Sequence, residues 1–424
     1  MWRFATTLIG LDRPPTAYSY QQNSTPHAML DSGMGKTHNQ QGTPILFFSE
    51  ANMEEEMVRR FHGIDRHKRS ATISVLDRTG AEVEFIQSCS DFNGYIATLG
   101  PEDAVVFETG LGSFYWADKI EEKGASCNII NPYKFRIIKD SWNKTDKQDS
   151  RNMAKALWVH AVTGEFGLPV VYKPQRDIRE LRRFFSVYAS LNKHLVMLKN
   201  GVQSILTENG IVLSTENKRL LLSAKTGMSL LEELDISDAS RISVRISLEL
   251  LWKVQEQKEQ LAKEIFYAGK PFEKEVKLLI SIKGITPLSA LAFLSDVGDV
   301  RRFKTTRKMS AYLGLVPKLK ESGDVSRVGH INRASRKTTR TLLTQSLVQA
   351  MSASPYLKSY YENVKDRRGA GRGRIALIRK LCGIMRRMLL TGEQFREVNI
   401  ELYQKKVRQF DRTIKTLEEE KKSA

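Results

Sequence analysis

The sequence contains little of what several protein classes require. Three cysteines occur among its 424 residues, too few and too scattered for a disulfide framework or a zinc site: Cys89, Cys127 and Cys382. Its apolar runs fall well short of the roughly 18 residues that a membrane-spanning helix needs. The apolar start is interrupted at Asp12 and Arg13 without a small-residue cleavage site close behind, so we expect no secretory signal. We therefore expect a cytoplasmic protein without a membrane partner.

Positive charge is what the chain has in excess. The formal net charge is +19, with 41% hydrophobic residues, which suffice for ordinary cores. Residues 301–390 contain 22 Lys or Arg and only four acids, so almost the whole excess lies in about a fifth of the chain. A solubilising surface would mix both signs. A block of one sign that also contains tyrosines favours nucleic-acid phosphates as the partner.

The pattern along the chain predicts five parts. Residues 1–56 are polar and without a sustained period, as in a disordered arm. Strand patterns and then alternating strands and helices over 57–165 predict an α/β domain, a mixed sheet flanked by helices. A long helical coiled coil is expected over 166–270, and a mostly α-helical, basic domain over 271–392. The last part, 393–424, is expected to be a charged helix or tail.

The central helical part has an apolar stripe at alternating spacings of three and four, which is typical of a heptad repeat. A second amphipathic stretch follows over 248–265, after turn signals. Two alternatives remain open: a helical hairpin that closes on itself, or a coiled coil that also dimerises. The first stripe consists of Leu181, Phe184, Tyr188, Leu191, Leu195, Leu198, Val202 and Ile205.

Four acids in the α/β domain are candidates for chemistry. Asp65 and Glu108 lie at the ends of expected strands, where ligands bind in open α/β sheets, and Asp146 and Asp149 share one face of a helix start. Singly, the aspartates read more simply as turn or first-turn residues, whereas a buried Glu108 needs a partner or a metal. Converging acids need cations, and two Mg²⁺ ions about 4 Å apart would suit phosphodiester displacement.

Two features of the basic part are further candidates. Gly284 is expected to turn the chain between two helices, where free amides of the second helix could seat a phosphate. Ser322 is expected in a Pro-broken loop between two helices, and by itself a loop serine followed by glycine is a turn. The cations expected to bind nucleic acid near this serine are Lys318, Lys320, Arg327, Arg333, Arg336, Lys337 and Arg340.

Together these motifs resemble a known family. The segments GID, VFETG and KTDKQDSRNMA, followed by KGITPLSALAFLSDVGDVRRF and KESG, are similar to the DEDD transposases of insertion sequences related to the Piv DNA invertase, the IS-one-ten family. The resemblance covers about residues 58–392 in the right order. It implies a RuvC-like (RNase H-like) DEDD domain over 57–165 and a transposase domain with a serine over 271–392. Carried over by position, Asp65, Glu108, Asp146 and Asp149 are the metal ligands and Ser322 is the nucleophile.

The resemblance also implies a mechanism and partners. DNA would be cut and rejoined through a phosphoserine link, in a site that combines the metal-bound acids with Ser322, from the same subunit or from another in a homodimer or tetramer. A structured guide RNA encoded by the element would pair with donor and target DNA, in the bacterial cytoplasm at the nucleoid. The chain departs from the family pattern at Lys283–Thr286 and Ser150, and Ser326 is a near alternative to Ser322.

Two other functions remain open. A RuvC-like nuclease would use water, and Ser322 would then be an ordinary loop residue. A catalytically inactive protein would bind nucleic acid through its basic part without cutting it. A proofreading-type DEDD exonuclease is disfavoured, because its first motif needs a second acid two positions after the first, where this chain has His67.

Overall fold

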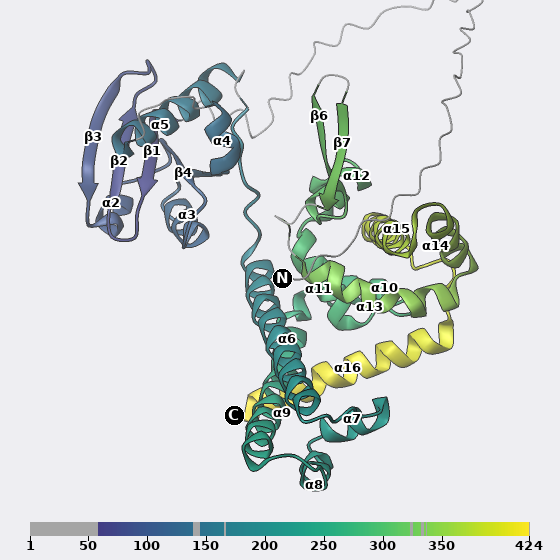
Figure 1. The fold of residues 1–424 in the computed structure, drawn as a ribbon. Coiled ribbons are helices and arrows are strands. Elements are labelled where there is room, and N and C mark those ends of the chain that lie inside the picture. Colours follow the sequence, from purple (N-terminus) through teal and green to yellow (C-terminus); the bar gives the residue numbers. More distant parts are fainter. Residues whose placement is uncertain are drawn as a thin grey trace, which may run out of the picture.

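The computed structural model describes residues 58–138, 145–164, 167–322, 325–331, 335 and 337–423. The arm expected over 1–56 lies outside these residues. Figure 1 shows an α/β domain followed by long paired helices and a larger helical region. In the part that the structure describes, no helix combines the length and the apolar character that crossing a membrane requires.

The α/β domain is built on a five-stranded mixed sheet, in the order β3-β2-β1-β4-β5. β2 is antiparallel to both β1 and β3, and β4 and β5 run parallel to β1. This confirms the mixed sheet that the pattern predicts. The strands are β1 Arg60–Arg66, β2 Ala71–Leu76, β3 Glu82–Cys89, β4 Asp103–Glu108 and β5 Ser126–Ile130.

Helices cover both faces of this sheet because its central strands are apolar on both sides. Along β4, Val105 and Phe107 face the core beneath α2 and α3, and Ala104 and Val106 face the core beneath α4 and α5. Such strands need cover on both faces to bury their side chains. The helices are α2 Phe92–Ala97, α3 Ser113–Glu121, α4 Pro132–Ile138 and α5 Asp146–Thr163.

Two long antiparallel helices follow, α6 (Arg176–Glu208) and α9 (Asp238–Ala268), which lie side by side in Figure 1. The end of α6 shares a core with the start of α9, and the start of α6 shares a core with the end of α9. This is the hairpin arrangement; dimerisation stays a prediction. Between them lie two short helices, α7 Thr215–Leu221 and α8 Gly227–Glu232, and the second expected turn overlaps the start of α8.

The buried stripe of α6 differs from the heptad prediction at four of its eight positions. Leu191 and Leu198 are only half-buried. Phe185 and Leu206 are buried, whereas Phe184 and Ile205 are only half-buried. A straight helix repeats every 3.6 residues and so drifts away from a strict heptad. The helix also packs against more than one neighbour, since Leu181 and Phe185 belong to the same core as α11.

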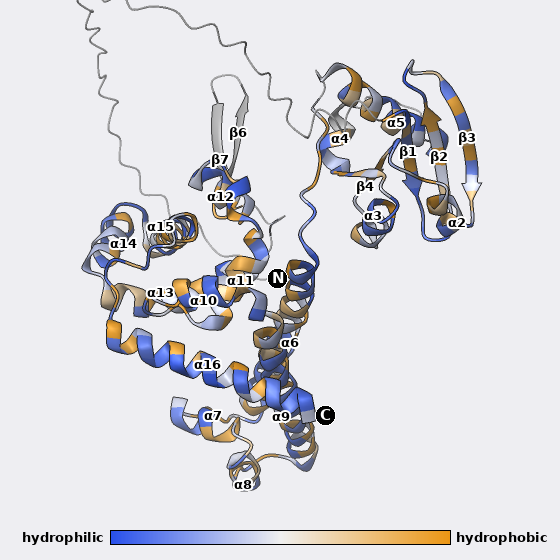
Figure 2. Cartoon of the chain, turned by 180° about the vertical axis from the view of Figure 1, so that it is seen from behind, coloured by the Kyte–Doolittle hydropathy of each residue, from blue (hydrophilic) through white to orange (hydrophobic). Residues whose placement is uncertain are grey.

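The remaining helices enclose the largest core of the described chain, which also includes Ile265 of α9. The expected charged helix or tail contains α16, whose Phe410 and Ile414 are buried in this core. Figure 2 shows hydrophilic residues along most of α16 with hydrophobic ones between them. The helices are α10 Glu273–Leu279, α11 Pro287–Val297, α12 Thr306–Tyr312, α13 Thr338–Ala353, α14 Pro355–Arg368, α15 Ala370–Thr391 and α16 Ile400–Ser423.

One element of the basic part was predicted wrongly. Instead of a loop between two helices, the chain forms an antiparallel hairpin of β6 (Pro317–Ser322) and β7 (Val325–Ile331). Polar and apolar residues alternate over 317–320 but not over the rest of the two strands, so the hairpin signal in the sequence is weak. Figures 1 and 2 show the hairpin projecting from the helical region beside α12, toward the end of the molecule where the α/β domain lies.

Candidate active site

Two of the predicted acids lie at adjacent strand ends. In the parallel register of β1 and β4, Ile64 is opposite Phe107, and Asp65 and Glu108 follow these two residues directly. Both carboxylates are half-buried, with 22% of the Asp65 side chain exposed. Because the carboxyl ends of parallel strands meet at one edge of the sheet, these acids share the edge where α/β folds bind ligands.

A glycine on β1 brings α5 to the same edge. A Cβ atom at Gly63 would lie 2.1 Å from the carbonyl oxygen of Ser150 and 2.2 Å from the amide nitrogen of Ala154. The helix therefore crosses β1 at a distance that only glycine admits. Thr145 starts the helix by accepting a hydrogen bond from the Gln148 amide at 3.2 Å. This close crossing places the first turn of α5, with its two aspartates, beside the end of β1.

The closest group at this edge contains Asp65, His67 and Asp146. The Nε2 atom of His67 lies 3.0 Å from Oδ2 of Asp146 and 3.7 Å from Oδ2 of Asp65. One ligand atom from each residue lies within 4.8 Å of the other two. The imidazole is 46% exposed and the Asp146 carboxylate 61% exposed, so the group is open to solvent and to a substrate.

The donor atoms of this group fit a divalent cation. Two ligands that occupy neighbouring positions of an octahedral ion are about 3 Å apart when each lies about 2.1 Å from the ion. The separations of 3.0 and 3.7 Å between His67 and the two carboxylates are close to that value. Carboxylate oxygens suit Mg²⁺ or Mn²⁺, and an imidazole nitrogen adds affinity for transition-metal ions. The three residues thus form a possible metal-binding group.

The other two predicted ligands lie next to this group but outside it. Asp149 is on the first turn of α5, one turn after Asp146, and is buried. Glu108 is on the neighbouring strand end. The structure therefore joins Asp65 with Asp146 and leaves Glu108 and Asp149 in adjacent positions.

His67 was missed as a candidate ligand by sequence reasoning. In the sequence this residue only disfavours an exonuclease, although its position also indicates a possible metal ligand. It follows Asp65 by two residues where β1 ends, and side chains at i and i+2 of extended chain point to the same side. Histidine is also a common metal ligand.

Ser322 lies on a different part of the chain from the acids. It is the last residue of β6, opposite Val325 of β7, next to a tip whose residues 323–324 lie outside the described ones. Ser326 is one position further from the tip, opposite Glu321.

The cations predicted around the serine fall into three groups. Lys318, Lys320 and Arg327 belong to the hairpin strands, with Lys320 opposite Arg327. Lys337 is exposed where α13 begins, and Nη1 of Arg340 donates to the Gly314 carbonyl at 3.5 Å. Arg333 and Arg336 lie outside the described residues.

The turn at Gly284 is used for internal packing. A Cβ atom there would lie 2.6 Å from the carbonyl oxygen of Ser346, so the turn abuts α13. The amides that start α11 are partly satisfied by a reciprocal cap between Thr286 and Ser289. The ammonium of Lys406 donates to three carbonyl oxygens of the same segment, those of Ile280, Ile282 and Ile285, at 2.9, 3.0 and 3.0 Å. Fewer amides are left for a phosphate than the sequence predicts.

Comparison with known proteins shows which family this chain resembles. Residues 62–210 match a family model for DEDD transposases of the IS110 type, and residues 276–362 match the model of the IS116/IS110/IS902 transposase family. A probable family 20 transposase of Pseudomonas aeruginosa is 25% identical over 340 residues, which cover 78% of this chain and 93% of that protein. The transposase for insertion sequence element IS1111A of Coxiella burnetii is 26% identical over 316 residues, 71% and 82% of the two chains.

Two independent segments in the same order thus match one family, and the first contains Asp65, Glu108, Asp146 and Asp149. This chain belongs to the DEDD transposases of the IS110 family of insertion sequences, enzymes that act on DNA.

Proposed function

We propose that this transposase cuts and rejoins DNA strands at the ends of its insertion sequence through a serine–phosphate link that depends on metal-bound acids. The observation that carries the proposal is the group of Asp65, His67 and Asp146, where the end of β1 meets the start of α5. The mixed sheet with helices on both faces supports a RuvC-like domain.

The acids of the α/β domain hold and orient the scissile phosphate. Asp65, Asp146 and His67 converge on one position, and Glu108 and Asp149 border it. Bound divalent ions, two of them and most simply Mg²⁺, would neutralise the phosphate and stabilise the attacking and leaving oxygens. Because Asp149 is buried and Gly63 fixes the helix crossing, the ligands are held in place before substrate binds.

Ser322 supplies the nucleophile in this proposal. Its hydroxyl oxygen forms a bond to phosphorus while the bond from phosphorus to a deoxyribose oxygen breaks, and the hydroxyl proton ends on the released strand. Rejoining reverses these steps with a different strand end. One phosphodiester bond replaces another in each step, so no phosphodiester bond is lost to hydrolysis. The serine hairpin would meet the acids of its own chain or those of a partner copy in a homodimer or tetramer.

The basic residues hold the nucleic acids. The hairpin cations Lys318, Lys320 and Arg327, with Lys337 and Arg340 at the start of α13, would bind the DNA strand near the serine. Arg333 and Arg336 complete the predicted set. A structured guide RNA is the second nucleic acid in the proposal, and its pairing would select the target in the bacterial nucleoid.

The test uses end-labelled DNA that carries the element's ends. Wild-type protein with Mg²⁺ should give an adduct that survives denaturation, and Ser322→Ala and Asp65→Asn should each abolish it. Ser326→Ala, a neighbour on the same hairpin, should leave it unchanged. Cleavage that persists in Ser322→Ala but is lost in Asp65→Asn would mean that water is the nucleophile, and the enzyme would then be a nuclease of RuvC type.

A further inference from the structure

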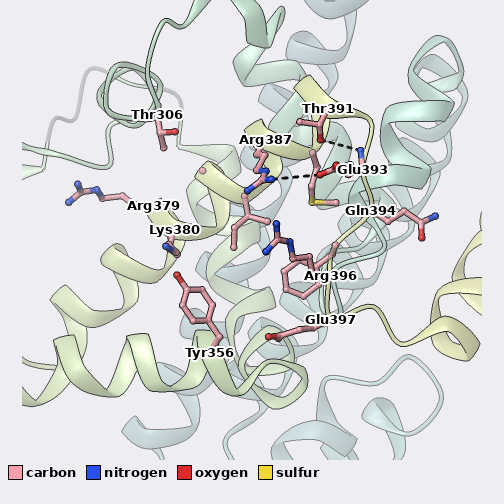
Figure 3. Close-up of a pocket in the computed structure, with 14 residues that line it drawn as sticks. Thr306, Tyr356, Arg379, Lys380, Arg387, Thr391, Glu393, Gln394, Arg396 and Glu397 are labelled. Carbon is pink, nitrogen blue, oxygen red and sulfur yellow. Dashed lines mark hydrogen bonds and ion pairs between the residues drawn. The ribbon is translucent and has the colours of Figure 1, made fainter.

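A basic cavity is lined by residues that belong neither to the acid group nor to the serine hairpin. It has a volume of about 640 Å³ and is formed by α15, the start of α14 and the loop over residues 392–397, with Thr306 of α12 at its edge. Figure 3 shows Arg379, Lys380, Arg387 and Arg396 around it, with Tyr356 rising from α14. None of these residues belongs to the predicted DNA-binding set.

The cavity has more positive than negative charge. Four cations line it, against the two acids Glu393 and Glu397. Arg387 pairs with Glu393 at 3.9 Å, but both side chains are more than 60% exposed, so the pair is weak. Among the described residues no carboxylate pairs with Arg379 or Arg396, and both are exposed. Phosphate groups would therefore find guanidinium donors whose hydrogen bonds go only to water.

The aromatic side of the cavity is fixed by the local structure. Ser354 starts α14 by accepting a hydrogen bond from the Leu357 amide at 3.2 Å, and Leu357 is fully buried. Tyr356 lies between these two residues with 51% of its surface exposed. The cap thus fixes the backbone at Tyr356 while its ring stays open to a ligand.

A lysine lies beside this ring. The Lys380 ammonium is 5.0 Å from the centre of the Tyr356 ring and 5.6 Å from that of Tyr360, within the range of a cation–π contact. Figure 3 shows the Tyr356 hydroxyl directed toward Lys380. An exposed ring with a cation beside it, and arginines around the same cavity, combine the two elements that bind unpaired bases and their phosphates.

We propose that this cavity binds a single-stranded nucleic-acid segment, with one base stacked on Tyr356 and the adjoining phosphates at Arg379, Arg387 and Arg396. A base inside a duplex is already stacked on both faces, so a double strand would not use the ring. The inference rests on the proposed function only in that the substrate is nucleic acid; it is independent of Ser322 and of the metal ligands.

The test measures binding of the full chain to labelled twelve-nucleotide oligo(dT) and oligo(U) by fluorescence anisotropy, with a DNA duplex of equal length for comparison. Tyr356→Ala should weaken single-strand binding about 5- to 100-fold, as loss of one stacked base does. Tyr356→Phe should stay within about twofold of wild type, because the ring remains. Duplex affinity should not change in either variant.

Control variants distinguish binding in this cavity from general attraction of nucleic acid to a basic protein. Tyr133→Ala removes a tyrosine of the α/β domain that is 80% exposed and should leave all affinities unchanged. Arg379→Ala with Arg396→Ala should lower the slope of log affinity against log salt by about 1.4 for single strands, and Arg183→Ala, on α6, should not. A larger loss for oligo(U) than for oligo(dT) would identify RNA as the natural occupant, and the reverse would identify DNA.

Unchanged affinity of Tyr356→Ala for both single strands would overturn the proposal. So would an equal loss for single strands and duplex, because that would mean that the ring does not contact an unpaired base. Ser322→Ala should bind all three nucleic acids as wild type does, so failure of the serine chemistry and failure of this cavity give different results.

Discussion

The close crossing of β1 by α5 makes Gly63→Ala a demanding test of the site. The added methyl carbon would lie 2.1 and 2.2 Å from two backbone atoms of α5, and real contacts of this kind are rarely below 3.0 Å. Backbone cannot rotate away as a side chain can, so the helix must shift by about 1 Å. Overpacking of a buried site costs about 1–3 kcal/mol of the free energy of unfolding.

The same shift would separate the residues of the proposed metal-binding group. Asp146 begins α5, and its carboxylate is 3.0 Å from His67, so a displacement of about a third of this distance separates the ligands. We expect the affinity for Mn²⁺, measured by electron paramagnetic resonance titration, to fall by about tenfold or more, since an offset of about 1 Å is large for a bound ion.

A glycine-to-alanine substitution elsewhere in a helix is the control for the loss of stability expected where α5 crosses β1. Gly201 lies within α6, and a Cβ atom there would meet nothing within 4 Å. Gly201→Ala should therefore raise stability by about 0.5–1 kcal/mol, because alanine loses less freedom in a helix. If Gly63→Ala unfolded in urea at the wild-type midpoint and bound Mn²⁺ equally well, our account of the site would be refuted.

Three further predictions follow from contacts elsewhere in the site and the core. His67→Ala should weaken Mn²⁺ binding about tenfold and Mg²⁺ binding less, because magnesium prefers oxygen ligands; equal calorimetric affinities for the variant and wild type would contradict a ligand role, with Lys68→Ala as control. Burial raises the pKa of Asp103, but hydrogen bonds from His62 and Arg60 outweigh it and hold that pKa at about 2. A carboxyl whose pKa is depressed in the folded state stabilises the fold above about pH 4, and this stabilisation is lost as the pH falls toward about 2. Asp103→Asn should therefore remove about 2 kcal/mol of the free energy of unfolding at pH 7, and the urea midpoint of the variant should change less with pH between about 4 and 2. Lys406→Met leaves three carbonyls without their donor and should lower the free energy of unfolding by at least about 2 kcal/mol, measured by thermal unfolding. Lys405→Met, which changes an exposed neighbour, is the control and should lower it little.

Much of the sheet and its acids follows from local pattern. The apolar run before Glu108 and the capped start of α5 before Asp146 are local signals, and parallel strand ends meet wherever the sheet forms. The closeness of α5 to Gly63 is different, because it depends on which helix crosses which strand. His67 is close to Asp65 along the chain, but its contact with Asp146 depends on this crossing.

The basic region was less predictable for two physical reasons. Around Ser322 the turn residues are compatible with either a loop or a hairpin, and the short alternating strands carry weak signals beside many cations. The cavity at Tyr356 joins α14, α15 and the loop after α15, whose packing is set by the shared core and not by spacing along the chain.

The length of the hairpin that carries Ser322 would amplify any rotation at its base. Five residue steps of extended strand separate Ser322 from Pro317, which lies two residues after the buried Leu315. At about 3.3 Å per step, the serine stands roughly 16 Å from Pro317. A tilt of about 20° at the base, similar to the ordinary twist between neighbouring strands, would sweep the serine through roughly 6 Å. A small rotation at the base of the hairpin would thus move its tip further, and in the proposed mechanism such a rotation would bring Ser322 toward the acids or away from them while the helical core stays still.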